Sequence, residues 1–294
     1  MPFPETDRKT CHDCSSRHQC LIGRQSDAAR APWAAMVEER RFRKGDVLQH
    51  QGETAGAVAV IKVGTALLQR AGADQVARPV AMAGCGQALG TSAVLGTPED
   101  LTWVALMEGR LCEVPAAALL RAGGGGTEFL QSLLREEVQA RARLADWSGL
   151  LRRRGVTAQL ASALLQLSQL QRSTLVRLPT HTVLASLLAT TRETVARSLT
   201  QLALHGAVVR HDRWHCAIVR GPLMALLEGR AVKAPAAALP VTAATLAVPA
   251  LAPPVAAAPL RRRVARREAG IPVARRPVRA AAAPKAPSPQ AVQA

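Results

Sequence analysis

The stretch THTVLASLLATTRETVARSL, residues 180–199, has the pattern of two short helices joined by a tight turn. Thr180 can cap the first helix, and Thr190 or Thr191 can cap the second, because a threonine hydroxyl accepts a hydrogen bond from a free amide of the first helical turn. Ala185 supplies a small side chain where two crossing helices approach closely. The stretch therefore predicts a helix-turn-helix motif.

The second of these helices has two different faces. Apolar residues at helical spacing form the side that packs on the protein, namely Val195, Leu199 and Leu202. Another side is free to enter a DNA groove and carries Glu193, Ala196, Arg197 and Thr200. Arginine can donate two hydrogen bonds to guanine, and glutamate can accept one from cytosine. We therefore predict a recognition helix, although a helical hairpin with a solvated charged face would show the same pattern.

Two short strands are expected after this motif, at residues 208–210 and 214–219, around the turn His211-Asp212-Arg213. A ribbon in this place would form a wing near the DNA backbone. The rest of residues 156–221 is expected to be mainly helical. Residues 155–225 are thus predicted to form a winged helix-turn-helix domain.

The region before this domain has a different sequence pattern. Residues 40–122 contain short apolar runs separated by glycines, which is typical of a small antiparallel barrel or sandwich, and we place this domain at residues 25–126. A helix is expected from Thr127 to about Arg154, with Gly155 ending it. Such a helix, at residues 127–154, would be about 40 Å long, more than one small barrel can cover. We therefore expect it to pair with a second copy in a homodimer.

The apolar stripe of this helix supports the pairing. It comprises Leu130, Leu133, Leu134, Val138, Leu144, Trp147 and Leu151. Charged residues interrupt it, and like charges that face each other across a two-fold axis would weaken a dimer. These residues are Glu136, Glu137, Arg141 and Arg143, most of which we expect to be solvated.

Charge points to a polyanionic partner. The 294 residues carry a net charge of +17, and residues 231–294 alone hold +9, which leaves +8 for the rest. Residues 226–294 are rich in alanine, proline and arginine without periodicity, so we expect a disordered basic tail. The sequence shows neither a secretory signal nor an apolar run of the roughly 18 residues that a membrane span needs, so we expect a cytoplasmic protein and no membrane partner.

Three cysteines lie close together in residues 1–24. Cys11, Cys14 and Cys20 have the spacing C-x2-C-x5-C. A reducing compartment disfavours a disulfide, so thiolate ligation of iron or zinc is the natural interpretation. A fourth donor must come from elsewhere, and the candidates are Cys85, Cys112 and Cys216.

The spacing alone leaves other possibilities open. Zinc could use His12 or His18 as ligands, or the thiols could be free. A dithiol oxidoreductase would need its Cys11-x-x-Cys14 pair at the start of a helix after a strand, and residues 1–10 offer no strand, so we do not expect an enzyme.

The order of these features resembles the Crp/Fnr family of transcription regulators, and its oxygen-sensing Fnr branch in particular, over about residues 10–220. The resemblance rests on four features: the cysteine spacing, the short apolar runs separated by glycines, the long helix, and the stretch Arg192-Glu193-Thr194-Val195-Ala196-Arg197. The resemblance implies an α+β fold with an antiparallel β-roll, a dimerisation helix and a winged helix-turn-helix. It also implies that Cys11, Cys14, Cys20 and Cys112 hold a 4Fe-4S cluster, because Cys112-Glu113-Val114-Pro115 matches the context of the family's fourth ligand.

The resemblance further implies a regulator that binds palindromic DNA with TTGAT-like half-sites, contacts RNA polymerase, and loses its active dimer when oxygen or nitric oxide destroys the cluster. A zinc-stabilised regulator of the same fold is the alternative. Ala196 replaces a serine of the Fnr pattern, so we expect weaker discrimination at one position of the half-site. His181 stands where an arginine is frequent, so one phosphate contact is expected to be weaker or to depend on pH. The expected DNA contacts are Thr180, His181, Thr191, Arg192, Glu193, Ala196 and Arg197.

Another branch of the family binds cyclic nucleotides. In residues 86–96 this chain has Gln87 where we expect an acid, and it has no arginine to pair with a phosphate. We therefore expect no cyclic nucleotide.

Overall fold

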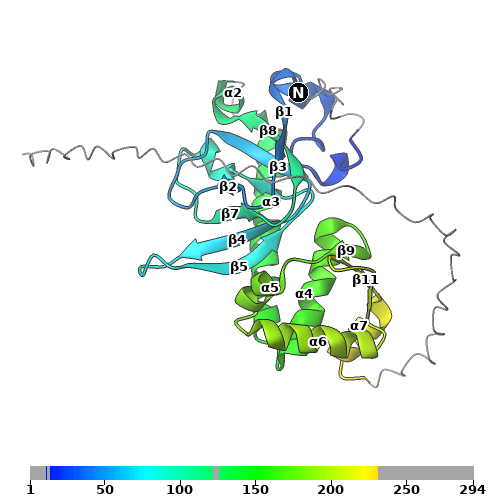
Figure 1. Ribbon diagram of the computed structural model, residues 1–294. Coiled ribbons are helices and arrows are strands. Elements are labelled where there is room, and N and C mark those ends of the chain that lie inside the picture. The colour runs from blue at the N-terminus through cyan, green and yellow to red at the C-terminus, as the bar shows by residue number, and fades with distance from the viewer. Residues whose placement is uncertain (1–10, 12–13, 122–125, 231–294) are drawn as a thin grey trace, which may run out of the picture. The chain divides into compact units, whose positions relative to one another are not determined.

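The computed structural model describes residues 11, 14–121 and 126–230 (Figure 1). The predicted disordered tail falls almost wholly outside these residues. Within them, no helix is both long and apolar enough to span a lipid bilayer.

An antiparallel β-roll forms the first domain, as predicted. Its two four-stranded sheets have the strand orders β1-β8-β3-β6 and β2-β7-β4-β5. The segment β3, with three valines and an isoleucine, forms a strand because β-branched side chains pack well on a pleated surface. The strands are β1 (Glu38–Phe42), β2 (Val47–Gln49), β3 (Ala57–Val63), β4 (Ala66–Ala71), β5 (Ala77–Ala83), β6 (Ala88–Leu89), β7 (Thr102–Ala105) and β8 (Gly109–Pro115).

Short helices surround the roll. They are η2 (Arg17–Gln19), α1 (Asp27–Arg30), η3 (Ala34–Met36), η4 (Thr91–Val94) and α2 (Ala116–Arg121). Gly90, before η4, has a φ of 72°, and a Cβ there would lie 2.1 Å from the carbonyl oxygen of Ala57, so only glycine fits this turn.

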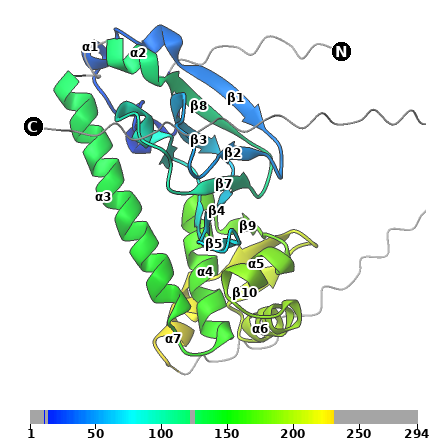
Figure 2. The same cartoon turned by 90° about the vertical axis from the view of Figure 1, so that its left-hand side faces the viewer.

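The long helix α3 (Gly126–Leu151) runs along the roll toward the second domain, as Figure 2 shows. It ends three residues before the expected boundary at Arg154. Gly155, predicted to close this helix, instead precedes α4 (Val156–Gln171) as its N-cap, with a φ of 85°. The turn is tighter than predicted because α4 starts almost at once, and the left-handed glycine reverses the chain.

The second domain is a winged helix-turn-helix. It contains α4, α5 (His181–Leu187), α6 (Arg192–Leu204), α7 (Arg220–Leu227) and the sheet β10-β11-β9. The predicted ribbon is present as β10 (Val208–Arg210) and β11 (His215–Ile218). The third strand, β9 (Leu175–Arg177), was not predicted, because no turn joins it to its partner β11 and only the folded domain brings the two together. Helix α7 extends two residues past the expected domain boundary at 225.

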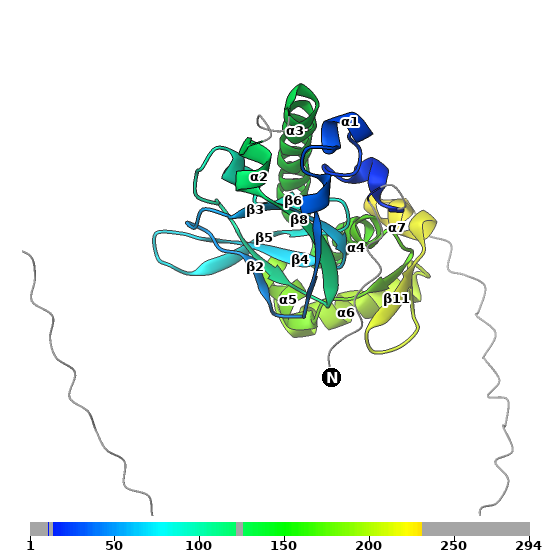
Figure 3. The ribbon, with the colours of Figure 1, turned by 90° about the horizontal axis from the view of Figure 1, so that it is seen from above.

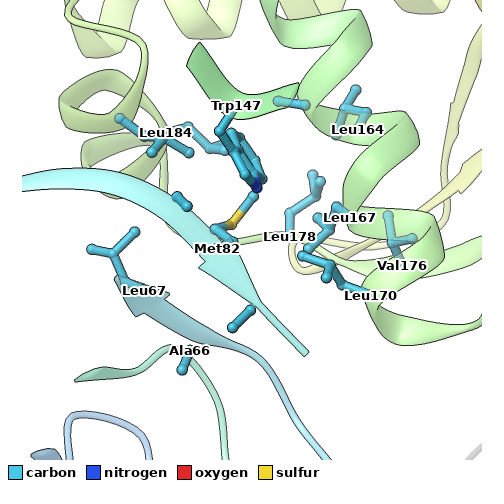
Figure 4. Close-up of a cluster of buried hydrophobic side chains, with 14 of the residues drawn as sticks. Ala66, Leu67, Met82, Trp147, Leu164, Leu167, Leu170, Val176, Leu178 and Leu184 are labelled. Carbon is cyan, nitrogen blue, oxygen red and sulfur yellow. The ribbon is translucent and has the colours of Figure 1, made fainter. Parts of the chain in front are cut away.

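One apolar core runs from the roll into the second domain. Figure 4 shows Met82 of β5 beside Trp147 of α3, with leucines of α4 and Leu184 of α5 around them. Trp147 is 2% exposed and Leu164 and Leu167 are fully buried. A separate cluster on the outer face of the β1-β8-β3-β6 sheet includes Trp33, Val58, Val114 and Phe129.

Candidate functional site

The cysteine-bearing segment packs on the outer face of the β1-β8-β3-β6 sheet. Cys20 is buried there, and Cys11 packs against the same apolar cluster. Cys112 lies in β8 between Glu39 of β1 and Val60 of β3. Because side chains alternate along a strand, Cys112 shares a face with Val114, which belongs to this cluster, and not with Leu111, which belongs to the main core. Cys112 therefore faces the cysteine segment.

The four cysteines predicted as ligands are electrostatic neighbours. Burial, with smaller contributions from Cys11 and Cys14, raises the pKa of Cys20 to about 11. Burial raises the pKa of Cys112 to about 12, and Cys20 and Cys11 act in the same direction. The pKa of Cys11 is also raised, first by burial and then by Cys14 among its neighbours. The fold thus brings Cys112 near Cys11 and Cys20, which lie up to 101 positions away in the sequence.

Positive side chains lie around these thiols. Lys62 lowers the pKa of Cys112, and Arg30 lowers that of Cys11. Burial opposes the charge of Lys62, but its ion pair with Glu39, with Nζ and Oε2 2.5 Å apart, raises its pKa above the usual range. Arg30 is 6% exposed and donates to the carbonyl oxygen of Gly23 at 2.8 Å. Neither cation was singled out from the sequence, because their proximity depends on strand pairing.

This donor set fits an anionic iron–sulfur cluster in its chemistry. Four soft sulfurs would ligate the iron, and the cationic neighbours would stabilise the negative charge of the thiolate-bound cluster. The apolar side chains beneath would limit its contact with water. In the described part of the chain, no three cysteine, histidine or acidic side chains stand in a ready-made arrangement for a single metal ion. His12, considered above as a zinc ligand, lies outside the described residues, and His18 is exposed.

The end of the cysteine segment and the residues that follow it contact the long helix, beginning with Arg24, which donates to the carbonyl oxygen of Ser132 at 2.5 Å. The amide and hydroxyl of Ser26 donate to the two carboxylate oxygens of Glu128 at 2.5 and 2.7 Å. The ring of Trp33 meets that of Phe129 edge-on, with centroids 6.1 Å apart. Figure 3 shows α1 beside α3, in agreement with these contacts. A change in the cysteine segment can therefore reach the helix that was predicted to dimerise.

The other two cysteines have separate environments. Cys216 is fully buried in the core of the second domain. Cys85 follows β5, and its Sγ donates to the carbonyl oxygen of Lys62 at 2.9 Å and lies 3.4 Å from the Oγ of Ser16.

Helix α3 carries an exposed apolar face in this single chain. Its exposed large hydrophobic residues are Leu130, Leu134, Val138 and Leu144. By contrast, Trp147 of the predicted stripe is buried in the core. Glu136, expected to be solvated or at a dimer seam, is 2% exposed and pairs with Arg143 at 2.5 Å. Its burial follows from the packing of α3 on the roll, where it accepts from the amide of Ala88 at 3.5 Å.

The region considered for a cyclic nucleotide contains a buried polar network. Gln49 donates to Glu99 at 2.8 Å and accepts from the amide of Gly90 at 2.7 Å. Ser92 donates to the other oxygen of Glu99. Burial raises the pKa of Glu99. Gln87 is 9% exposed and its side-chain oxygen accepts from the amide of Gly84 at 3.4 Å.

Both predicted helix caps of the helix-turn-helix motif are confirmed. The Oγ1 of Thr180 accepts from the amide of Val183 at 3.3 Å. Of the two candidates for the second cap it is Thr191 that acts, accepting from the amide of Thr194 at 3.2 Å. Val195, Leu199 and Leu202 are buried as predicted, and Ser198 joins them.

The opposite face of α6 is open. Arg192, Glu193 and Arg197 are exposed, and Ala196 is half-buried. Hydrogen bonds from its own backbone amide and from Thr191, together with the positive charges of Arg192 and Arg197, lower the pKa of Glu193. This carboxylate is therefore ionised and can only accept hydrogen bonds, as recognition of cytosine requires.

His181 lies beside this face. Burial lowers its pKa, and Arg210 and Arg192 lower it further. Histidine, the wing strand and the recognition helix thus present one basic surface. At the tip of the wing, Asp212 accepts from the amides of Trp214 and His215 at 2.5 and 2.7 Å. These bonds make a fixed turn, and the hydrogen bond from His215 lowers the pKa of Asp212 to about 2.

Comparisons with known protein families agree with the division of the chain into a β-roll and a helix-turn-helix domain. Residues 39–122 match the cyclic nucleotide-binding domain family, and residues 158–220 match the Crp-like helix-turn-helix domain family. No curated protein matches the chain in sequence.

Solved structures share the fold at low sequence identity. FixK2 from Bradyrhizobium japonicum superposes with a TM-score of 0.57 at 22% identity, over 67% of this chain and 99% of that one. A CRP/FNR-family transcriptional regulator from Thermus thermophilus gives 0.51 at 22%, over 66% and 100%. The c-di-GMP-responsive global regulator CLP of Xanthomonas campestris gives 0.52 at 15%, over 66% and 100%.

Proposed function

We propose that this chain, whose two domains match the cyclic nucleotide-binding and Crp-like helix-turn-helix families, is a DNA-binding transcription regulator of the Crp/Fnr type, and that a 4Fe-4S cluster held by Cys11, Cys14, Cys20 and Cys112 switches its promoter binding. The observation that supports the proposal is the packing of Cys11 and Cys20 on the sheet face that carries Cys112, with Lys62 near them. When bound, the cluster would supply a link between the N-terminal segment and β8 that oxygen or nitric oxide can break.

The chain's own residues would convert that link into dimerisation. Drawing Cys11, Cys14 and Cys20 toward Cys112 holds the segment against α3, where Ser26 bonds Glu128 and Trp33 packs on Phe129. Fixing the start of α3 lowers the entropy cost of pairing its exposed leucines and valine with a second copy. Metal binding and assembly are then coupled equilibria.

The dimer would place two copies of α6 about one DNA turn apart, some 34 Å, as palindromic sites require. Glu193 and Arg197 are the proposed base readers, with Ala196 able to touch a thymine methyl group. Thr180, His181, Thr191 and Arg192 are proposed to contact the flanking backbone. We propose TTGAT-like half-sites, and RNA polymerase as the further partner of the bound dimer.

One experiment tests the proposal. The full chain is reconstituted under anaerobic conditions with iron and sulfide, and its visible spectrum, iron and acid-labile sulfide are measured. Four irons and four sulfides per chain, with a broad absorption that air abolishes, are expected. A colourless protein that takes up zinc in place of iron would instead establish the zinc-stabilised regulator.

A further inference from the structure

The C-terminal end of α4 packs closely on the roll, next to the cysteine segment. The carbonyl oxygen of Leu170 accepts from the amide of Cys85 at 3.0 Å. A Cβ at Gly84 would lie 2.6 Å from the same oxygen, so the two backbones can approach only because glycine stands there. This contact joins the DNA-binding domain directly to the loop after β5.

Arg172 extends the contact to the cysteine segment. It caps α4 in the left-handed region, with a φ of 52°, which aims its side chain back toward the roll. Its Nη1 donates to the Oγ of Ser16 at 3.2 Å, and its Nη2 donates to the Oε1 of Gln19. Ser16 is 7% exposed, and besides Arg172 its hydroxyl has the Sγ of Cys85 at 3.4 Å as a weak partner, so loss of the Arg172 bond would leave it poorly paired.

Ser16 and Gln19, to which Arg172 donates, lie in the turn between the proposed ligands Cys14 and Cys20. The amide of Arg17 donates to the carbonyl oxygen of Cys14 at 3.0 Å, and the amide of Cys20 donates to that of Ser16 at 3.1 Å. Fixing the sulfurs of Cys14 and Cys20 would therefore fix the position of the Ser16 hydroxyl. The turn is too short to absorb a movement of either cysteine without moving Ser16.

We propose that Arg172 is a positioning residue that couples the cysteine segment to the DNA-binding domain within one chain. The link itself is independent of iron, whereas its regulation rests on the proposed function. It differs from the route through α3, because it reaches the recognition helix through α4 and needs no second copy. The packing of Leu167 and Leu170 of α4 in the same core as Met82 of the roll transmits the constraint, since close-packed interiors are not easily deformed (Figure 4).

Arg172→Gly tests this coupling without straining the fold. Glycine adopts the left-handed conformation freely, so the cap of α4 is kept while both hydrogen bonds are lost. Lys44→Ala is the matched control. Lys44 lies 5.7 Å from the ring of Trp214 and so also joins the roll to the second domain, but it does not touch the cysteine segment.

Hydrogen exchange of the full chain, with and without anaerobic reconstitution with iron and sulfide, is the measurement. In the iron-free protein, Arg172→Gly should speed exchange at the amides of Cys20 and Cys85 about tenfold, and Lys44→Ala should not. Reconstitution should slow exchange at the end of α4, residues 168–172, in the unaltered protein and in Lys44→Ala, but not in Arg172→Gly.

Three results would overturn the inference. They are unchanged protection of Cys20 and Cys85 in Arg172→Gly, slowed exchange of the α4 end by reconstitution in that variant, and equal effects of the two substitutions. If the unaltered protein takes up no iron, the proposed cluster fails, but the iron-free comparison still decides whether Arg172 holds the segment.

Discussion

The amide of Thr190 donates to the carbonyl oxygen of Ala185 at 2.9 Å, and this bond closes the turn between the two helices of the DNA-binding motif. The closure forces Ala189, between them, to a φ of 49°. A left-handed alanine is strained, because its Cβ crowds the backbone. The turn is thus held by its neighbours, since Leu187 and Leu188 on one side and Val195 on the other are buried.

This strain predicts a stabilising substitution. Ala189→Gly should raise the free energy of unfolding by about 1 kcal/mol, because glycine adopts this conformation without steric cost. The matched control is Ala203→Gly, inside α6, which should lower it by about 1 kcal/mol. Urea unfolding of both variants measures the effects. A loss of stability in Ala189→Gly comparable to that of the control would contradict the strain.

The fourth ligand can be identified by substitution. Cys112→Ser should abolish assembly of an iron–sulfur cluster, because Cys112 is the proposed donor from the sheet face. Cys85→Ser is the control, since Cys85 is also near the segment but is engaged with Lys62 and Ser16. Iron and sulfide are measured after anaerobic reconstitution. A full load of four irons in the Cys112 variant would exclude this residue as a ligand.

Base recognition by α6 predicts a loss of specificity. Replacing Glu193 or Arg197 by alanine should reduce the free energy of binding to a TTGAT palindrome by about 1–3 kcal/mol and leave the binding of scrambled DNA almost unchanged. Arg213→Ala, in the exposed wing turn, is the control and should lower the affinity for both DNAs by similar factors. Gel-shift titrations of the unaltered protein and the three variants on both DNAs measure the affinities. Equal losses on both DNAs for the α6 variants would mean that these residues contact phosphates.

His181 predicts a dependence on pH. Because burial, Arg210 and Arg192 hold its pKa below the ordinary value of 6.5, it is neutral at pH 7 in the free protein. A nearby phosphate favours the protonated form, so DNA binding should strengthen as the pH falls from 7 through 6. Conversely, the fold itself loses stability as the pH falls below 6.5, since the unfolded chain then binds more protons.

His181→Gln should flatten the rise in DNA affinity, while His205→Gln, at the exposed C-terminal end of α6, should leave it in place. Fluorescence anisotropy at constant ionic strength across this range makes the comparison. The phosphate contact would be refuted by an identical pH profile in the His181 variant.

The basic tail, which lies outside the described residues, is predicted to increase the affinity for DNA without adding sequence specificity. Deleting residues 231–294 should weaken binding to specific and scrambled DNA by similar factors and flatten the slope of log K against log salt, because positive charges that neutralise phosphates act by releasing counterions whatever the base sequence. The control keeps the chain length and replaces the arginines of residues 261–279 by glutamine. An unchanged salt slope in both proteins would show that the tail does not bind DNA.

Local patterns in the sequence were sufficient for much of the architecture. Thr180 and Thr191 cap their helices, and Val195, Leu199 and Leu202 are buried, because caps and helical periodicity act within a few residues of the chain. The short apolar runs of residues 40–122 became an antiparallel roll for the same reason. The spacing of Cys11, Cys14 and Cys20 was likewise visible, but it could not identify a metal.

Tertiary structure decided the relationships between distant segments. Strand pairing places Cys112 and Lys62 next to the N-terminal segment, and packing on the roll buries Glu136, whose charge had indicated an exposed position. The contact of Arg172 with Ser16 joins residues 156 positions apart, and no local pattern specifies it. The physical reason is the same in each case: these contacts depend on which surfaces meet when strands pair and helices dock, and that is a property of the whole chain.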